Sequence, residues 1–190
     1  MFKKQQGWLR VFDRGWVLLI PVASAAAGED GWICVMALFL STYEKKIDKK
    51  GRVSVPVSFR GALAGQNFNG VIVYASFIHS CIEACGMDRI EKLYEQIETL
   101  DPFSEERDAF ATAILGGSQQ LAFDGEGRVS LPEELMKEAG IEEGCVFVGK
   151  GATFEIWEPK AFATYEAESR KLAKEKRLAL RSDSMRGGAA

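Results

Sequence analysis

One ten-residue stretch occurs twice in this chain of 190 residues, and it limits what the chain can fold into. The first copy, residues 47–56, reads IDKKGRVSVP, and the second copy, residues 123–132, reads FDGEGRVSLP. Six of the ten positions are identical at a constant offset of 76 residues (123 − 47), and two more exchange one apolar residue for another. A repeat of this kind predicts two copies of one supersecondary unit.

Each copy predicts a strand, a tight turn, a second strand and a short helix. Asp48 and Asp124 end the first strand, where an Asp side chain can accept hydrogen bonds from the backbone that follows. Gly51 and Gly127 then permit the positive φ angle of a tight turn. The next residues alternate polar and apolar as a half-buried strand does, and Pro suits the first turn of a helix. The expected helices cover residues 57–63 and 133–139.

The rest of the sequence predicts further strands and helices. Apolar runs at residues 71–74, 81–85, 144–149 and 153–157 predict strands. Asp88 is expected to cap a helix over residues 89–100, Ser104 to cap a helix over residues 105–114, and Pro159 to begin the last helix. The buried face of the helix after Asp88 is expected to carry Ile90, Leu93, Tyr94 and Ile97.

Charge separates the two copies of the repeat. The whole chain has a net charge of −3, which by itself argues against a generic nucleic-acid binder. Residues 43–60 carry six basic and two acidic side chains, a net charge of +4, whereas residues 119–137 carry two basic and four acidic side chains, a net charge of −2. A local basic patch can attract a polyanion although the total charge is negative. We therefore expect the first copy to meet such a partner.

The two ends of the chain lie outside the repeat. We expect residues 1–36 to be an N-terminal extension that is not part of the fold; its basic segment, short apolar run and small residues superficially match a secretory signal. An over-extended translation start, with Met36 as the true beginning, is the favoured interpretation. Residues 168–190 are expected to form a basic tail. The four cysteines show no disulfide framework, so reduced thiols are expected at Cys34, Cys81, Cys85 and Cys145.

The doubled motif resembles the MraZ family. Each copy has Asp, then Gly-Arg, then Val-Ser-apolar-Pro, and each is followed by a short helix, an apolar strand and a later helix. The resemblance covers residues 37–165. It implies an α+β fold, in which two tandem AbrB/SpoVT-type swapped-hairpin units form a double-split β-barrel with flanking helices. The first AbrB-like unit, with a helical insertion, would span residues 37–115, and the second would span residues 116–167. The family often has Arg four residues after the Pro; Arg60 fits this pattern and Met136 does not.

The same resemblance implies a bacterial transcription regulator, cytoplasmic and associated with the nucleoid. Such proteins bind short direct repeats in double-stranded DNA upstream of the cell-division and cell-wall gene cluster, and they form ring-shaped homo-oligomers. We therefore expect DNA and further copies of the chain as partners, and no membrane, small-molecule substrate or cofactor. The positions that match the family motif are Asp48, Gly51 and Arg52 in the first copy and Asp124, Gly127 and Arg128 in the second.

Arg52 is the residue that we expect to read DNA bases. An Arg side chain can donate two parallel hydrogen bonds to guanine O6 and N7, and a Gly turn can hold it in that geometry. The alternative is an ion pair with Asp48 that only shapes the turn; the doubled motif and its basic flank favour DNA contact. For Arg128 both interpretations stay open, because its neighbours are acidic. The expected DNA contacts are Arg52, Lys45, Lys46, Lys49, Lys50, Arg60 and Arg128, with the lysines on phosphates. The expected turn-shaping residues are Asp48, Gly51, Asp124 and Gly127.

Metal binding and catalysis find little support in the sequence. His79, Cys81 and Cys85 match no standard zinc spacing, so core thiols and a loop histidine are the favoured interpretation. The chain has one His, no Gly-rich phosphate loop and no nucleophile elbow, so we do not expect an enzyme. Trp157 is expected on the face of its strand opposite the core, where it would help to pack a subunit interface.

Two other classes of protein stay open. A MazE-like antitoxin uses the same hairpin unit to bind a toxin, but that role suits an acidic tail and the tail of this chain is basic. An exported protein is the second alternative, if residues 1–35 act as a signal.

Overall fold

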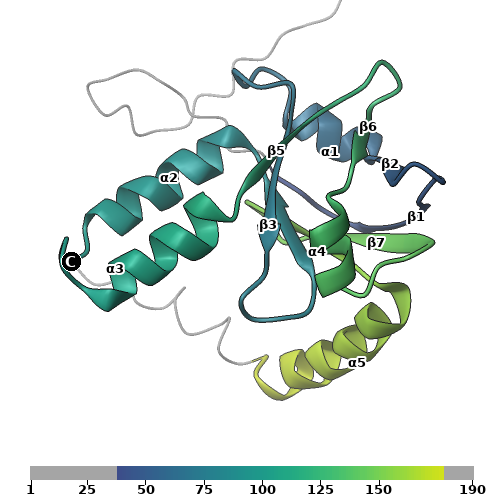
Figure 1. Cartoon of the computed structure of the whole chain (residues 1–190). Coiled ribbons are helices and arrows are strands. Elements are labelled where there is room, and N and C mark those ends of the chain that lie inside the picture. Colours follow the sequence, from purple (N-terminus) through teal and green to yellow (C-terminus); the bar gives the residue numbers. More distant parts are fainter. Residues whose placement is uncertain (1–37, 178–190) are drawn as a thin grey trace, which may run out of the picture. The chain divides into compact units, whose positions relative to one another are not determined.

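The computed structural model describes residues 38–177. The expected extension, residues 1–36, lies outside the described residues, as do Cys34 and the end of the basic tail. The described part is an α+β arrangement of antiparallel strands and flanking helices (Figure 1). In chain order its elements are β1 (Thr42–Lys46), β2 (Arg52–Ser54), α1 (Val57–Ala62), β3 (Gly70–Ala75), β4 (Ile82–Cys85), α2 (Met87–Glu98), α3 (Glu105–Phe110), the π-helical turn η1 (Ala111–Gly116), β5 (Gln119–Ala122), β6 (Arg128–Ser130), α4 (Glu133–Glu138), β7 (Gly144–Gly149), β8 (Phe154–Trp157) and α5 (Pro159–Glu175).

Both copies of the repeat form the predicted strand, turn, strand and helix. Gly51 and Gly127 have φ angles of +73° and +71°, a region that Gly adopts without the clash of a Cβ. Pro56 and Pro132 are the N-cap residues of α1 and α4. The two helices begin at the predicted residues and end one residue earlier than predicted.

The two halves of the chain exchange strands. β1 pairs with β7 from the second half, and β5 pairs with β3 from the first half. β4 and β8 pair at the centre, so the six-stranded sheet has the order β1-β7-β8-β4-β3-β5. β2 and β6 form a separate two-stranded ribbon. The pairing of β1 with β7 is therefore equivalent to the pairing of β5 with β3.

The main core lies between one face of the six-stranded sheet and a layer made of the ribbon, α1 and α4. Phe59 of α1 is at its centre and is 1% exposed. Its ring centroid lies 4.9 Å from that of Phe154, 5.3 Å from that of Phe39 and 5.5 Å from that of Tyr43. Burial of a Phe side chain contributes about 1.5–3 kcal/mol, so this aromatic cluster holds the two halves together.

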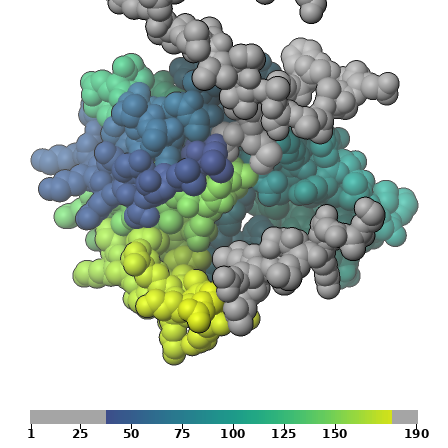
Figure 2. Space-filling model, turned by 180° about the vertical axis from the view of Figure 1, so that it is seen from behind, coloured from purple at the N-terminus to yellow at the C-terminus, as the bar shows by residue number. Residues whose placement is uncertain are grey.

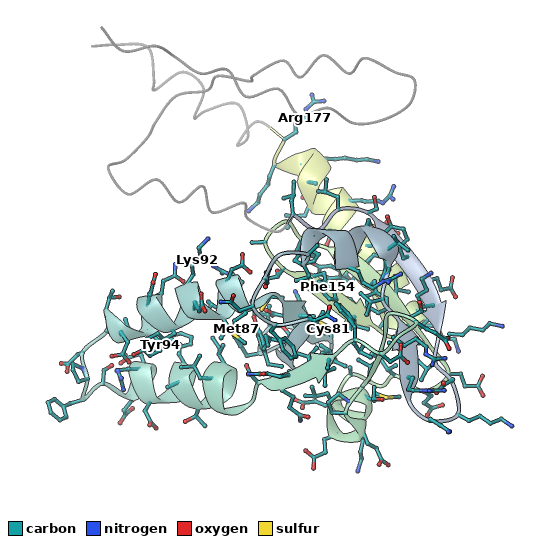
Figure 3. The ribbon with its side chains drawn as sticks, turned by 90° about the horizontal axis from the view of Figure 1, so that it is seen from above. Cys81, Met87, Lys92, Tyr94, Phe154 and Arg177 are labelled. Carbon is teal, nitrogen blue, oxygen red and sulfur yellow. The ribbon has the colours of Figure 1, made fainter. Side chains whose placement is uncertain are left out.

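Helices cover the other face of the sheet at two separate places. Ile97 of α2 and Ile114 of η1 pack on β3, whereas Phe162 of α5 packs on β7 and β8. α2 follows β4 as α5 follows β8, so the two helices hold equivalent positions in the two halves. Figure 3 shows Phe154 within the body of the protein, while α2 and α3 extend away from it. β3 and β7 are apolar on both faces because both faces are covered.

The predicted helix caps differ in their outcome. The side chain of Ser104 accepts a hydrogen bond from the backbone N–H of Arg107 at 3.2 Å, so the predicted cap of α3 is confirmed. The predicted cap at Asp88 is wrong, because Gly86 is the N-cap of α2 and Asp88 lies in the first turn. There its Oδ1 accepts a hydrogen bond from Gln66 at 3.0 Å, and a carboxylate in a first turn still favours the helix dipole.

Two aromatic side chains have a different environment from the one predicted. Tyr94 was predicted on the buried face of its helix, but it is 51% exposed, because α2 packs on β3 along a narrower face that holds Ile97. Trp157 is on the predicted face of its strand, but α5 of the same chain covers it. Its ring is 4% exposed and stacks on that of Tyr165 at 4.7 Å. The predicted role of Trp157 in a subunit interface is therefore wrong.

Candidate nucleic-acid interface

The two repeated arginines lie on one face of the ribbon. Arg52 is opposite Ser130, and Arg128 is opposite Ser54, with a pair of valines between them. Side chains alternate along a strand, so these four polar residues share one face and the valines share the other. The valines belong to the main core. Arg52 and Arg128 therefore lie on the outward face as diagonal neighbours.

Asp48 closes the first turn. Its Oδ1 accepts hydrogen bonds from the backbone N–H groups of Lys50 at 2.8 Å and Arg52 at 3.0 Å. Its Oδ2 accepts a hydrogen bond from Nε of Arg52 at 2.8 Å and lies 2.6 Å from Nη2. The hydrogen bond from the Arg52 side chain is the main reason that the pKa of Asp48 falls to about 2. The Arg52 side chain is 31% exposed, so the pair orients the guanidinium without removing it from solvent.

The second turn repeats this arrangement with one addition. Oδ1 of Asp124 accepts hydrogen bonds from the backbone of Glu126 and of Arg128, both at 2.9 Å, and Oδ2 accepts one from Nε of Arg128 at 2.8 Å. Glu126 adds a contact that Lys50 in the first turn lacks, since its Oε2 lies 2.8 Å from Nη1 of Arg128. The hydrogen bond to Asp124 is the first cause that raises the pKa of Arg128. Two carboxylates therefore hold Arg128, which is 26% exposed.

Basic side chains surround the first turn. Lys46, Lys49 and Lys50 are exposed, and Lys45 is half-buried on β1. Figure 2 shows side chains of this segment, in purple and blue, projecting from one side of the protein. An open groove of about 690 Å³ lies beside the turn. Among the charged residues that line it are Lys45, Lys46 and Lys49 from the first half and Glu142 and Glu143 from the second.

Arg60 contacts the second turn, although it belongs to the first copy. Its Nε donates a hydrogen bond to the carbonyl of Val55 at 3.2 Å, and its guanidinium fills the space that a Cβ on Gly127 would take. Gly127 is buried as a result, whereas Gly51 is half-buried. The sequence contains no signal for this contact, because it arises from the pairing of β2 with β6.

The remaining candidate residues do not form a site. Cys81 and Cys85 are buried free thiols, as predicted, and burial raises the pKa of each to about 12. The His79 ring lies against Tyr165, with ring centroids 4.8 Å apart. Within residues 38–177, no group of three or more His, Cys, Asp or Glu side chains is placed to hold a metal ion. In the same range, no helix has the length and apolar character needed to cross a bilayer.

Fold and site together define a tandem-repeat α+β protein whose two halves share one ribbon and place one Arg-bearing turn on each of its strands. A family model described as "MraZ protein, putative antitoxin-like" matches residues 38–111 and 114–182. The two matched segments contain one copy of the repeat each.

Proteins named Transcriptional regulator MraZ are similar to this chain over most of its length. Those of Rickettsia africae (strain ESF-5) and Rickettsia felis (strain ATCC VR-1525 / URRWXCal2) are 58% identical over 147 residues, and that of Rickettsia bellii (strain OSU 85-389) is 58% identical over 148 residues. Each alignment covers 77% of this chain and 99% of the relative. The chain belongs to the MraZ family.

Proposed function

We propose that this chain is a sequence-specific DNA-binding regulator of transcription and not an enzyme. The main support for the proposal is the arrangement at the ribbon, where Asp48 orients a partly exposed Arg52 beside several exposed lysines. Membership of a family whose relatives are named transcriptional regulators supports it.

A two-stranded antiparallel ribbon such as β2 and β6 is an element suited to base readout. The major groove of B-DNA admits a two-stranded β-ribbon, and an Arg that enters it can donate two hydrogen bonds to guanine O6 and N7. One such bidentate contact contributes about 1–3 kcal/mol of discrimination between bases. Asp48 orients the guanidinium before DNA binds, which reduces the entropy lost on binding. Arg52 is therefore the proposed base reader.

The other basic residues have supporting roles in this proposal. Lys45, Lys46, Lys49 and Lys50 contact phosphates and position the ribbon without reading sequence. Arg128 contributes less than Arg52, because Asp124 and Glu126 already hold its guanidinium. Arg60 supports the second turn and adds positive charge beside the ribbon. The turn-shaping role proposed for Asp48, Gly51, Asp124 and Gly127 is supported by their hydrogen bonds and positive φ angles.

The exchange of β1 and β5 supports a swapped-hairpin, double-split barrel made of two AbrB-like units. We propose that the chain assembles into a ring-shaped homo-oligomer, so that several ribbons meet direct repeats upstream of the cell-division and cell-wall gene cluster. A regulator of this kind acts in the cytoplasm, on the nucleoid.

A binding assay on the DNA upstream of the chain's own coding sequence tests the proposal. Fluorescence anisotropy with this duplex and with a scrambled duplex gives the specific and nonspecific affinities at one salt concentration. We expect Arg52→Ala to weaken specific binding about tenfold or more and to change nonspecific binding much less. The matched variant Arg128→Ala should lose less specific affinity. Equal losses for Arg52→Ala on both duplexes would refute base reading, and equal affinity of the unmodified chain for both would refute sequence-specific binding.

A further inference from the structure

The two halves of the fold carry surfaces of opposite charge on equivalent helices. Residues 87–110, which form α2, α3 and the loop between them and which we name the acidic arm, hold eight acidic and three basic side chains, a net charge of −5. Residues 170–177, at the end of α5, hold five basic and one acidic side chain, a net charge of +4, and all are exposed. We name them the basic end of α5.

The two surfaces lie at opposite ends of the sheet. α2 packs on β3, the second strand from one edge, whereas α5 packs on β7, the second strand from the other edge. Figure 3 shows the arm, with Lys92 and Tyr94, and the end of α5, with Arg177, projecting from different sides of the body. A pair of complementary surfaces at two ends of one molecule suits contact between copies.

Both surfaces also carry exposed apolar side chains. On the arm, Phe103 is 97% exposed and Tyr94 is 51% exposed; on the end of α5, Leu172 is 52% exposed. Protein interfaces are typically built around aromatic and aliphatic anchors inside a polar rim. Charge around such anchors selects the partner and orients it.

We propose that the acidic arm of one copy docks on the basic end of α5 of the next copy. This inference rests on the proposed homo-oligomer and names the surfaces that build it. The contact is head-to-tail, because it joins two different surfaces, and repetition of a head-to-tail contact closes into a ring when the rotation permits. In this contact the basic end of α5 binds the acidic arm of the next copy and does not cover the first turn. The ribbon therefore stays free to bind DNA.

Charge reversal on the full-length chain tests the contact. Sedimentation velocity at low salt gives the size of the assembly for three chains. The first carries Arg170→Glu/Lys171→Glu/Lys174→Glu, which changes the net charge of the basic end of α5 from +4 to −2, and the second carries Glu91→Lys/Glu95→Lys/Glu106→Lys, which changes that of the acidic arm from −5 to +1. The third combines the two sets in one chain. We expect each set alone to raise the dissociation constant of the assembly about tenfold or more, and the combination to restore assembly. A mixture of the two variants should assemble too. In a ring where the two variants alternate, each unmodified arm meets an unmodified α5 and each reversed arm meets a reversed α5, so every contact joins opposite charges. Glu133→Lys/Glu134→Lys/Glu138→Lys on α4 reverses the same number of exposed charges, so it is the matched control and should keep the unmodified size.

The outcomes separate this inference from DNA binding. A monomeric unmodified chain, or an assembly that the charge reversals leave intact, would overturn the inference. The inference would also be overturned if the α5 variant assembled normally and lost only salt-dependent affinity for DNA. The basic end of α5 would then be a phosphate contact and not a subunit contact. A dissociated variant keeps Arg52 and its lysines, and it should still prefer its own upstream DNA to the scrambled duplex. If the unmodified chain itself binds both duplexes equally well, that result would count against the proposed function and not against the contact between copies.

Discussion

Arg60 lies against Gly127, so the first copy of the repeat supplies the side chain that covers the turn of the second. The equivalent glycine, Gly51, has no such cover, since the nearest atom to a Cβ there is the carbonyl oxygen of Leu131 at 3.7 Å. The two turns thus share their hydrogen bonds and their positive φ angles and differ in the side chain above them.

Substitution of each glycine by Ala should separate the effect of the positive φ angle from the effect of the Arg60 contact. Both Gly51→Ala and Gly127→Ala place a Cβ at positive φ, which costs about 1–2 kcal/mol of folding stability. Gly127→Ala also displaces Arg60 from its hydrogen bond to Val55, worth about 0.5–1.5 kcal/mol more. Denaturant unfolding measures the difference. In an Arg60→Ala background the two glycine variants should become equal, and a difference that persists there would contradict the role of Arg60.

The contact between Arg60 and Gly127 could not be predicted from the sequence. The motif predicted both turns, both short helices and the strands around them, because those depend on neighbouring residues. The cover over Gly127 depends on which strand pairs with which, and alternation along a strand indicates a buried face without naming what buries it. Trp157 illustrates the same limit: its face was predicted correctly, but α5 was not identified as its cover.

Phe59 should dominate the stability of the main core. It is 1% exposed and contacts rings from both halves, so Phe59→Ala should cost about 3–5 kcal/mol in the free energy of unfolding. Val57 lies on the same short helix and is 74% exposed, so Val57→Ala should change stability by less than about 0.5 kcal/mol. Chemical denaturation of the two variants measures both values. Similar losses for the two would show that α1 contributes through its helix and not through the aromatic cluster.

Acid should weaken the first turn. The pKa of Asp48 is about 2 in the folded protein, below its ordinary value of 3.8, because the ionised carboxylate accepts the hydrogen bonds of Arg52 and Lys50. A lowered pKa stabilises the fold above pH 3.8, and this contribution is lost as the pH falls from 3.8 to about 2. Thermal unfolding across that range should show a shallower acid dependence for Asp48→Asn than for the unmodified chain. Asp108→Asn, on the exposed face of α3, is the control, and an equal change in both variants would count against the pair.

The described thiols should be unreactive in the folded protein. Cys81, Cys85 and Cys145 are buried, and burial raises the pKa of each to about 12, so little thiolate forms at pH 8. In a Cys34→Ser variant, Ellman's reagent should therefore label no thiol rapidly under native conditions and all three after unfolding in denaturant. Rapid native labelling of any of the three would show that the protein opens locally around that cysteine.

Salt dependence should identify the phosphate contacts. Each lysine that neutralises a phosphate adds about 0.9 to the slope of log affinity against log salt, so Lys49→Ala and Lys50→Ala should each flatten that slope by about this amount. The loss should be similar on specific and scrambled DNA, because phosphate contacts read no sequence. Lys160→Ala removes an exposed positive charge from the start of α5, away from the ribbon, and should leave the slope unchanged. A change of the same size in Lys160→Ala would mean that net charge, and not contact at the first turn, sets the slope.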